Sequence, residues 1–159
     1  MSKDGNFPWR NASGDVVHLE KILSQIKDHT DDQGKVYVGA DSQLNRETCT
    51  FATVICLHGG EKRTSKYFFK KEKVSSGSNS VLRQRINQEV IRALSAFSMI
   101  IDDIPNVDIE IHVDIGSTDR SKTRAFVDSI TGWVRGLGVP CKIKPHAWAS
   151  ASVADRHTK

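Results

Sequence analysis

Two apolar segments of this chain have the pattern of buried strands, and each ends on an aspartate: residues 36–41 (Val-Tyr-Val-Gly-Ala-Asp) and residues 109–114 (Ile-Glu-Ile-His-Val-Asp). Open α/β sheets bind ligands at the carboxyl ends of their strands. If the two strands are parallel neighbours, Asp41 and Asp114 lie roughly 5 Å apart, the spacing of adjacent strands. A single aspartate after a strand is more often a turn residue. Two carboxylates so close repel each other, and a divalent cation removes the repulsion, so the pair predicts a metal site.

The composition is that of a globular protein with a hydrophobic core. The chain has 159 residues, of which 38% are hydrophobic, and this length fits one domain. Within that domain we expect residues 1–34 to form an arm and an amphipathic helix packed on a core of residues 35–159. The formal net charge of +4 is compatible with a polyanionic partner such as nucleic acid. The sequence does not indicate an oligomeric state.

Nothing in the sequence predicts a membrane partner. No apolar run is long enough to cross a bilayer, and the first residues lack the apolar core of a signal peptide. The three cysteines are odd in number, lie in or beside apolar segments and lack the spacing of metal ligands: Cys49, Cys56 and Cys141. We therefore expect reduced core cysteines in a cytoplasmic protein.

Hydrophobic periodicity divides the chain into helices and strands. The predicted helices cover residues 15–29, 80–99, 121–137 and 149–159, and the predicted strands cover residues 35–41, 48–57, 65–71, 107–114 and 141–144. Short links between the first three strands favour an antiparallel meander, whereas the later strand–helix–strand units favour right-handed parallel crossovers. We expect an α/β fold with a five-stranded mixed sheet flanked by helices. Residues 1–14 are expected to be a loose arm that docks through its aromatic side chains.

Two further carboxylates lie on elements that can reach the sheet. Glu89 stands at the border of the apolar stripe of the predicted helix 80–99, and Asp155 lies on the short terminal helix. Glu89 also has Arg85 and Arg92 at helical spacing, so a surface ion pair is an alternative. Asp155 has the alternative of pairing with Arg156 or capping its helix. Both alternatives stay open at this stage.

The order of these elements and carboxylates resembles that of ribonuclease H-like nucleases. Those enzymes take one Asp from the first strand, one Glu from the first core helix, one Asp from the fourth strand and a last carboxylate from the final helix. Several segments also resemble the YkuK-like family of ribonuclease H-like proteins: Val38-Gly39-Ala40-Asp41-Ser42-Gln43, His112-Val113-Asp114-Ile115-Gly116, Gly132-Trp133-Val134 and Ala154-Asp155-Arg156. The resemblance covers essentially the whole chain, from about residue 7 to residue 159.

The resemblance implies four catalytic metal ligands: Asp41, Glu89, Asp114 and Asp155. It implies two bound Mg²⁺ or Mn²⁺ ions, because these ions prefer oxygen ligands. It also implies hydrolysis of phosphodiester bonds in RNA, DNA or a hybrid. His157 is a candidate for assisting proton transfer. The alternatives are a non-catalytic nucleic-acid-binding or structural module with the same fold, and a phosphoryl-transfer enzyme acting on small nucleotides.

Candidate contacts to nucleic acid lie in three places. The first is the strand end at Ser42 and Gln43. The second is the segment 117–123, with Arg120, Lys122 and Thr123 before or at a helix start, where phosphates bind well and where an ordinary helix cap is the alternative. The third is the basic and aromatic segment 62–73, including Lys66 and Lys70. Lysines on an edge strand also prevent aggregation, and the two interpretations of this segment have equal weight.

Overall fold

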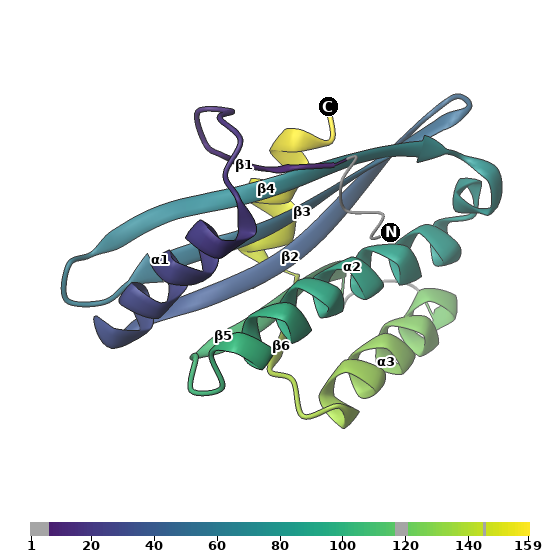
Figure 1. The fold of residues 1–159 in the computed structure, drawn as a ribbon. Helices are drawn as coiled ribbons and strands as arrows, with labels where there is room; N and C mark the ends of the chain where they lie inside the picture. Colours follow the sequence, from purple (N-terminus) through teal and green to yellow (C-terminus); the bar gives the residue numbers. More distant parts are fainter. Residues whose placement is uncertain (1–6, 117–120, 145) are drawn as a thin grey trace.

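The computed structural model describes residues 7–116, 121–144 and 146–159, and these form a six-stranded sheet with the strand order β1-β4-β3-β2-β5-β6 (Figure 1). The strands are β1 (Trp9–Asn11), β2 (Gly34–Asn45), β3 (Thr48–Gly59), β4 (Thr64–Ser75), β5 (Ile109–Gly116) and β6 (Cys141–Lys144). The pairs β1–β4, β4–β3 and β3–β2 are antiparallel, and the pairs β2–β5 and β5–β6 are parallel. The mixed sheet with a meander and parallel crossovers is therefore confirmed.

The sixth strand is the difference from the five that the sequence predicts. Trp9–Asn11 pairs with Phe68–Lys70 of β4, so part of the expected loose arm belongs to the sheet. Trp9 is 9% exposed and joins the core. A strand of three residues is too short to show the alternation by which strands are recognised in a sequence.

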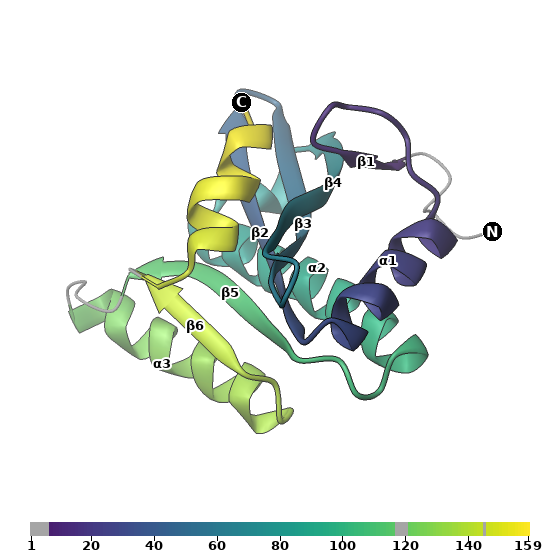
Figure 2. The ribbon, with the colours of Figure 1, turned by 90° about the vertical axis from the view of Figure 1, so that its left-hand side faces the viewer.

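Helices cover one face of the sheet, and the C-terminal segment covers the other (Figure 2). The helices are α1 (Leu19–Asp31), α2 (Leu82–Asp103) and α3 (Ser121–Gly136). The C-terminal segment consists of the π-helical turn η3 (Ala149–Ala154) and the 3₁₀ turn η4 (Asp155–His157). A further 3₁₀ turn, η2 (Gly77–Ser80), precedes α2. Because α2 and the C-terminal segment lie on opposite faces, they approach β2 from opposite sides.

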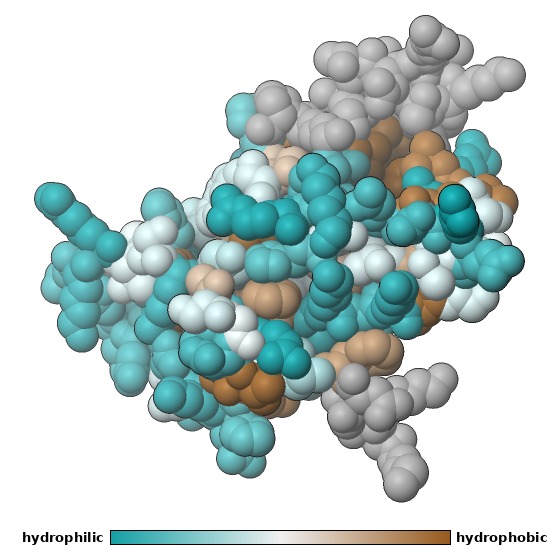
Figure 3. Space-filling view, turned by 90° about the horizontal axis from the view of Figure 1, so that it is seen from above, coloured by the Kyte–Doolittle hydropathy of each residue, from teal (hydrophilic) through white to brown (hydrophobic). Residues whose placement is uncertain are grey.

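The face of the molecule seen from above is largely polar. In the view from above (Figure 3), hydrophilic residues predominate and the hydrophobic ones form small separate groups. Among the described residues, none of the helices combines the length and the apolar composition that crossing a bilayer requires.

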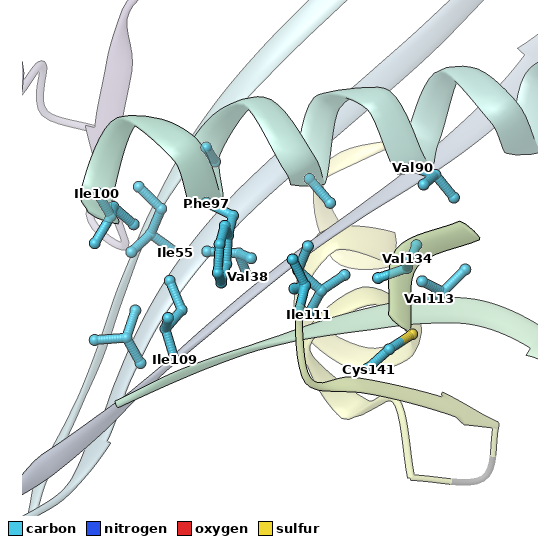
Figure 4. Close-up of a cluster of buried hydrophobic side chains, with 14 of the residues drawn as sticks. Val38, Ile55, Val90, Phe97, Ile100, Ile109, Ile111, Val113, Val134 and Cys141 are labelled. Atoms are coloured by element: carbon cyan, nitrogen blue, oxygen red, sulfur yellow. The ribbon is translucent and has the colours of Figure 1, made fainter. Parts of the chain in front are cut away.

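The main core lies between α2 and the sheet (Figure 4). Val38 of β2, Ile55 of β3 and Ile111 of β5 point to this side and meet Phe97 and Ile100 of α2. Within each strand the residues of this core recur at every second position, as Val36 and Val38 do in β2, which directs them to one face. Residues between them point to the other face, where a second cluster joins Val54 and Ala52 to residues of the C-terminal segment. The sheet is thus buried on both sides near the middle of β2 and β3.

Two predicted boundaries are wrong, and the first of them affects the site. The first long strand does not end at Asp41 but continues to Asn45, so Ser42 lies in β2 and not in a turn. Polar residues can extend a strand when a neighbour pairs with them, and Ser42 is paired with Phe51 of β3. The first helix begins at Leu19, because Val16 forms an isolated bridge with Arg10 instead.

Candidate active site

Asp41 and Asp114 lie side by side where the pairing of two parallel strands, β2 and β5, ends. The pairing of β2 with β5 runs from Val36–Ile109 to Ala40–Val113, and the two aspartates follow directly after its last pair. Asp41 is 7% exposed, and Asp114 is half-buried. Alternation along the strands places both on the face that carries the C-terminal segment. The predicted adjacency of these strand ends is therefore what the structure shows.

Glu89 reaches the same place from the other face of the sheet. It lies on α2, is 6% exposed, and accepts a hydrogen bond of 2.7 Å from the hydroxyl of Ser42 to its Oε1. The alternative of a surface ion pair with Arg92 does not describe this side chain, since the Arg92 guanidinium binds Glu72 of β4. Arg85 donates to the carbonyl oxygen of Asn79 and acts on Glu89 only through its charge.

Asp155 comes to Asp41 from the C-terminal segment. The two carboxyl groups interact, and this interaction contributes to raising the pKa of Asp41. Asp155 also lies 3.3 Å from Nζ of Lys159 through its Oδ2. The side chain of Asp155 thus faces the end of β2, as a member of a shared site would.

Burial and neighbouring charges raise the pKa of two of these carboxyl groups, Asp41 and Glu89. Burial, with the Asp155 hydrogen bond and the charge of Asp114, raises the pKa of Asp41 to about 7. Burial, with the charges of Asp41 and Asp114, raises the pKa of Glu89 to about 8, against the opposing hydrogen bond from Ser42. Strongly shifted acids that share a site are typical of functional centres. Asp41 interacts electrostatically with the other three carboxyl groups of the site, and their negative charges repel one another.

A chain of buried polar contacts holds the C-terminal segment on the sheet. The backbone N–H of Ala149 donates to Nδ1 of His112 at 3.0 Å, and Nε2 of His112 lies 2.8 Å from Glu110 Oε1. The other Glu110 oxygen lies 2.9 Å from Nζ of Lys35. Because Nδ1 accepts, the imidazole is neutral with its proton on Nε2, in accord with burial lowering the pKa of His112.

Gly39 makes this seating possible. A Cβ atom at Gly39 would lie 2.9 Å from the backbone nitrogen of Ser150 and 3.2 Å from the carbonyl carbon of Ala149. The close approach expected at a glycine within a strand is therefore present. Sequence analysis missed the role of His112. The signal was the repeated polar residue on one face of a buried strand, at Glu110, His112 and Asp114, since buried polar groups need partners.

His157 does not face the carboxylates through its Nε2. That atom is hydrogen-bonded to the hydroxyl of Tyr67 at 2.9 Å. The ring stacks on Phe69 with 3.7 Å between centroids and 8° between planes. Both partners belong to β4, so His157 anchors the end of the C-terminal segment to that strand.

The donors fit a hard divalent cation, although their present placement is not a finished coordination sphere. All four are carboxylates, with oxygen atoms of the kind that Mg²⁺ and Mn²⁺ prefer. Among residues 7–116, 121–144 and 146–159, no group of three or more acidic, histidine or cysteine side chains is arranged to hold a metal ion. Glu89 is instead hydrogen-bonded to Ser42, and Asp41 interacts with Asp155.

The predicted contacts to nucleic acid fall into three groups. Ser42 and Gln43 lie beside Asp41 on β2, with Ser42 bound to Glu89 and Gln43 exposed. Lys66 and Lys70 lie on the opposite face of the sheet, where Lys70 contacts Glu72 and stands over the Trp9 ring. The remaining three fall outside the description: the whole of Arg120, and the side chains of Lys122 and Thr123.

Comparison with known proteins gives one family and one relative. The family model described as ribonuclease H-like matches residues 17–159. The uncharacterized protein YkuK of Bacillus subtilis (strain 168) is 29% identical over 176 residues, which cover 97% of this chain and 98% of YkuK. No solved structure matches the chain significantly.

Proposed function

Because this chain belongs to the ribonuclease H-like family, we propose that it is a metal-dependent nuclease that hydrolyses phosphodiester bonds of RNA, DNA or their hybrid. The proposed metal ligands are the four carboxylates of the candidate site: Asp41, Glu89, Asp114 and Asp155. The proposed cofactor is Mg²⁺ or Mn²⁺, with two ions bound.

One observation carries this proposal: three carboxyl groups from separate elements act on that of Asp41, at the point where the pairing of β2 with β5 ends. Two of them are almost completely buried, which costs folding free energy unless protons or cations neutralise them. A fold gains nothing in stability from such a cluster. Its presence therefore supports a role in binding cations.

Different residues of the site have different proposed roles. Bound cations would supply the positive charge that activates a water and stabilises the leaving oxygen in phosphodiester hydrolysis. Asp41 stands between the other carboxylates and is the proposed shared ligand. Ser42 orients Glu89 through its hydroxyl. His112 and Gly39 seat the C-terminal segment and thereby bring Asp155 to Asp41.

A non-catalytic nucleic-acid-binding module is the second candidate. The observation that favours it is that no set of described side chains is arranged to hold a metal ion. The buried carboxylates count against it, because negative charge weakens the binding of a polyanion. The two candidates differ in whether metal binding and cleavage occur.

The deciding experiment uses purified protein with Mn²⁺ or Mg²⁺ and a panel of single-stranded, duplex, hybrid and junction substrates. We expect cleavage of at least one substrate, and we expect Asp41→Asn to abolish it without loss of fold by circular dichroism. Calorimetry measures metal binding by both proteins. Absence of metal binding together with absence of cleavage overturns the proposal. Hydrolysis of mononucleotides alone would instead indicate phosphoryl transfer on small nucleotides.

A further inference from the structure

The strand register continues the candidate site into a polar surface on the same face of the sheet. Asp41 is paired with Ala52 of β3, and Ala52 is paired with Lys71 of β4. Directly paired residues of antiparallel strands point to the same face, so Lys71 shares the face of Asp41 at roughly 10 Å, two strand spacings away. Lys71 is exposed.

The next row of the same face is also polar. It consists of Gln43, Thr50 and Lys73, which are paired in that order across β2, β3 and β4. The row lies roughly 7 Å further along the strands, two residues beyond the row of Asp41. Gln43 and Lys73 are exposed, and Thr50 is 8% exposed. We call these four residues the polar platform: Gln43, Thr50, Lys71 and Lys73.

The C-terminal segment ends where the platform begins. Ala149 and Ala154 pack on Ala52 and Val54 of β3, which are fully buried. His157 covers Phe69 of β4. The rows beyond Ala52 are therefore the first ones that the described C-terminal segment leaves accessible. Lys71 of the platform lies in the same row of paired residues as Asp41, with the buried Ala52 between them.

The charge of the platform complements a polyanion. Its two lysines stand beside a carboxylate cluster that repels a phosphate backbone. Their positive charges attract the phosphates and offset this repulsion. The acidic residue of this part of β4, Glu72, points to the other face and binds Arg92. The two rows thus contain cations, a hydroxyl and an amide, and no carboxylate other than Asp41 itself.

The platform does not offer aromatic rings for base stacking. Tyr67 and Phe69 lie on the same face but are engaged with His157. Stacking on exposed rings is how sheet surfaces hold unpaired bases. Cations and hydrogen-bonding groups without such rings suit the sugar–phosphate backbone, which has no base sequence to recognise.

We propose that the polar platform binds the phosphodiester backbone of a nucleic acid strand and leads it to Asp41. This inference rests on the proposed nuclease function and names the surface that its substrate crosses. It replaces Lys66 and Lys70 as contacts, because those lysines lie on the opposite face of the sheet. Binding through this surface is independent of base sequence and depends on salt.

The test measures binding separately from cleavage. A fluorescein-labelled single-stranded DNA of mixed sequence is titrated with Asp41→Asn protein, and anisotropy gives the dissociation constant at several salt concentrations. Adding Lys71→Gln and Lys73→Gln is expected to weaken binding on the order of tenfold at 0.1 M salt. It should also lower the slope of log K against log salt by about 1.4, the value for two phosphate contacts to a single strand. An RNA of the same sequence is the second arm.

Two controls make the result specific. Lys21→Gln with Lys27→Gln removes the same charge from α1, on the other side of the sheet, and is expected to leave the slope unchanged. Lys71→Arg with Lys73→Arg keeps the charge and is expected to retain binding. All variants are at exposed positions, and their melting temperatures verify the fold.

The outcomes separate the two proposals. If the platform double variant binds DNA and RNA as tightly as its parent, or loses no more than the α1 variant, the platform proposal is wrong, whether or not the protein cleaves. If binding falls as expected but the protein with intact Asp41 cleaves nothing and binds no metal, the platform stands and the nuclease proposal fails.

Discussion

The carboxyl group of Asp155 acts on that of Asp41 and contributes to raising its pKa, although one lies in the C-terminal segment and the other in the first long strand. Burial and neighbouring carboxyl groups favour the protonated form of Asp41. A bound cation would remove the same repulsion. This relationship makes the protonation of the site, its stability and its metal affinity depend on one another.

The metal-free protein is expected to lose stability as the pH rises. The pKa of Asp41 is raised from 3.8 to about 7, and that of Glu89 from 4.5 to about 8. Between about pH 4 and pH 8 the unfolded chain therefore releases protons that the folded chain retains. The stabilisation is full below about pH 4 and is lost as the pH rises through 7 and 8.

The measurement is the melting temperature in the presence of a chelator from pH 5 to pH 8.5, for the wild type and for Glu89→Gln. Glu89→Gln should show a shallower decrease, and it should be the more stable protein at pH 8.5. Asp128→Asn, which changes an exposed acid on α3, serves as the control and should follow the wild type. Parallel curves for wild type and Glu89→Gln would contradict the buried repulsion.

Mn²⁺ is expected to raise the melting temperature more at pH 8 than at pH 6. Carboxylate ligands must be deprotonated to bind a cation, so proton and metal compete for the same oxygens. At a hundredfold excess over the dissociation constant the stabilisation is about 2.7 kcal/mol. Differential scanning fluorimetry over a Mn²⁺ series checks this, and an equal shift at both pH values in Asp41→Asn would assign the effect to another site.

Ser42→Ala is expected to weaken metal binding without unfolding the protein. The Ser42 hydroxyl donates the 2.7 Å hydrogen bond to Glu89 and lowers the pKa of that carboxyl group. Loss of a hydrogen bond to a charged group costs about 1.5–3 kcal/mol. At pH 8.5, above the pKa of about 8 of Glu89, calorimetry with Mn²⁺ should show an affinity lower by roughly tenfold or more, converted from that free energy at 1.4 kcal/mol per factor of ten. Ser42→Thr keeps the hydroxyl and should restore most of the affinity.

Gly39→Ala is expected to displace the C-terminal segment. The added Cβ would lie 2.9 Å from the backbone nitrogen of Ser150, and backbone there cannot rotate away as a side chain can. Overpacking of this kind costs about 1–3 kcal/mol. Chemical denaturation gives the loss of stability, and calorimetry gives the accompanying loss of metal affinity as Asp155 moves away.

The matched control for that variant is Gly132→Ala on α3. A Cβ at Gly132 meets no atom within 4 Å, and alanine favours a helix by about 1 kcal/mol relative to glycine. This variant should be neutral or stabilised. Equal effects of the two substitutions would show that the seating of the C-terminal segment does not depend on close approach at Gly39.

The sequence was sufficient to predict five of the six strands and the positions of Asp41 and Asp114, because these depend on local pattern. Alternation placed the two aspartates on one face of their strands, and the antiparallel order of β2, β3 and β4 followed from the short links between them. The pairing of Trp9 with Lys70 was not predictable in this way, since it depends on contacts far apart in the sequence. The end of the first long strand was missed for the same reason.

The sequence did not show which way the side chains of the site point. Nothing near His157 in the sequence indicates that its ring stacks on Phe69 and its Nε2 meets Tyr67, because both partners come from β4. Lys70 and Lys71 are neighbours in the sequence and belong to opposite faces of the sheet. Only the pairing register of β2, β3 and β4 shows which of the two lysines lies on the face of Asp41, and this register is known from the structure.

The seating of Ala149–Ala154 across Gly39 also has a consequence for the order of folding. It joins segments that are distant in the sequence, and contacts of that kind carry the largest loop-closure entropy and slow folding most. A chain that has formed its meander and α2 but not this last contact lacks Asp155 at the site. The four carboxylates therefore come together only when this last contact has formed.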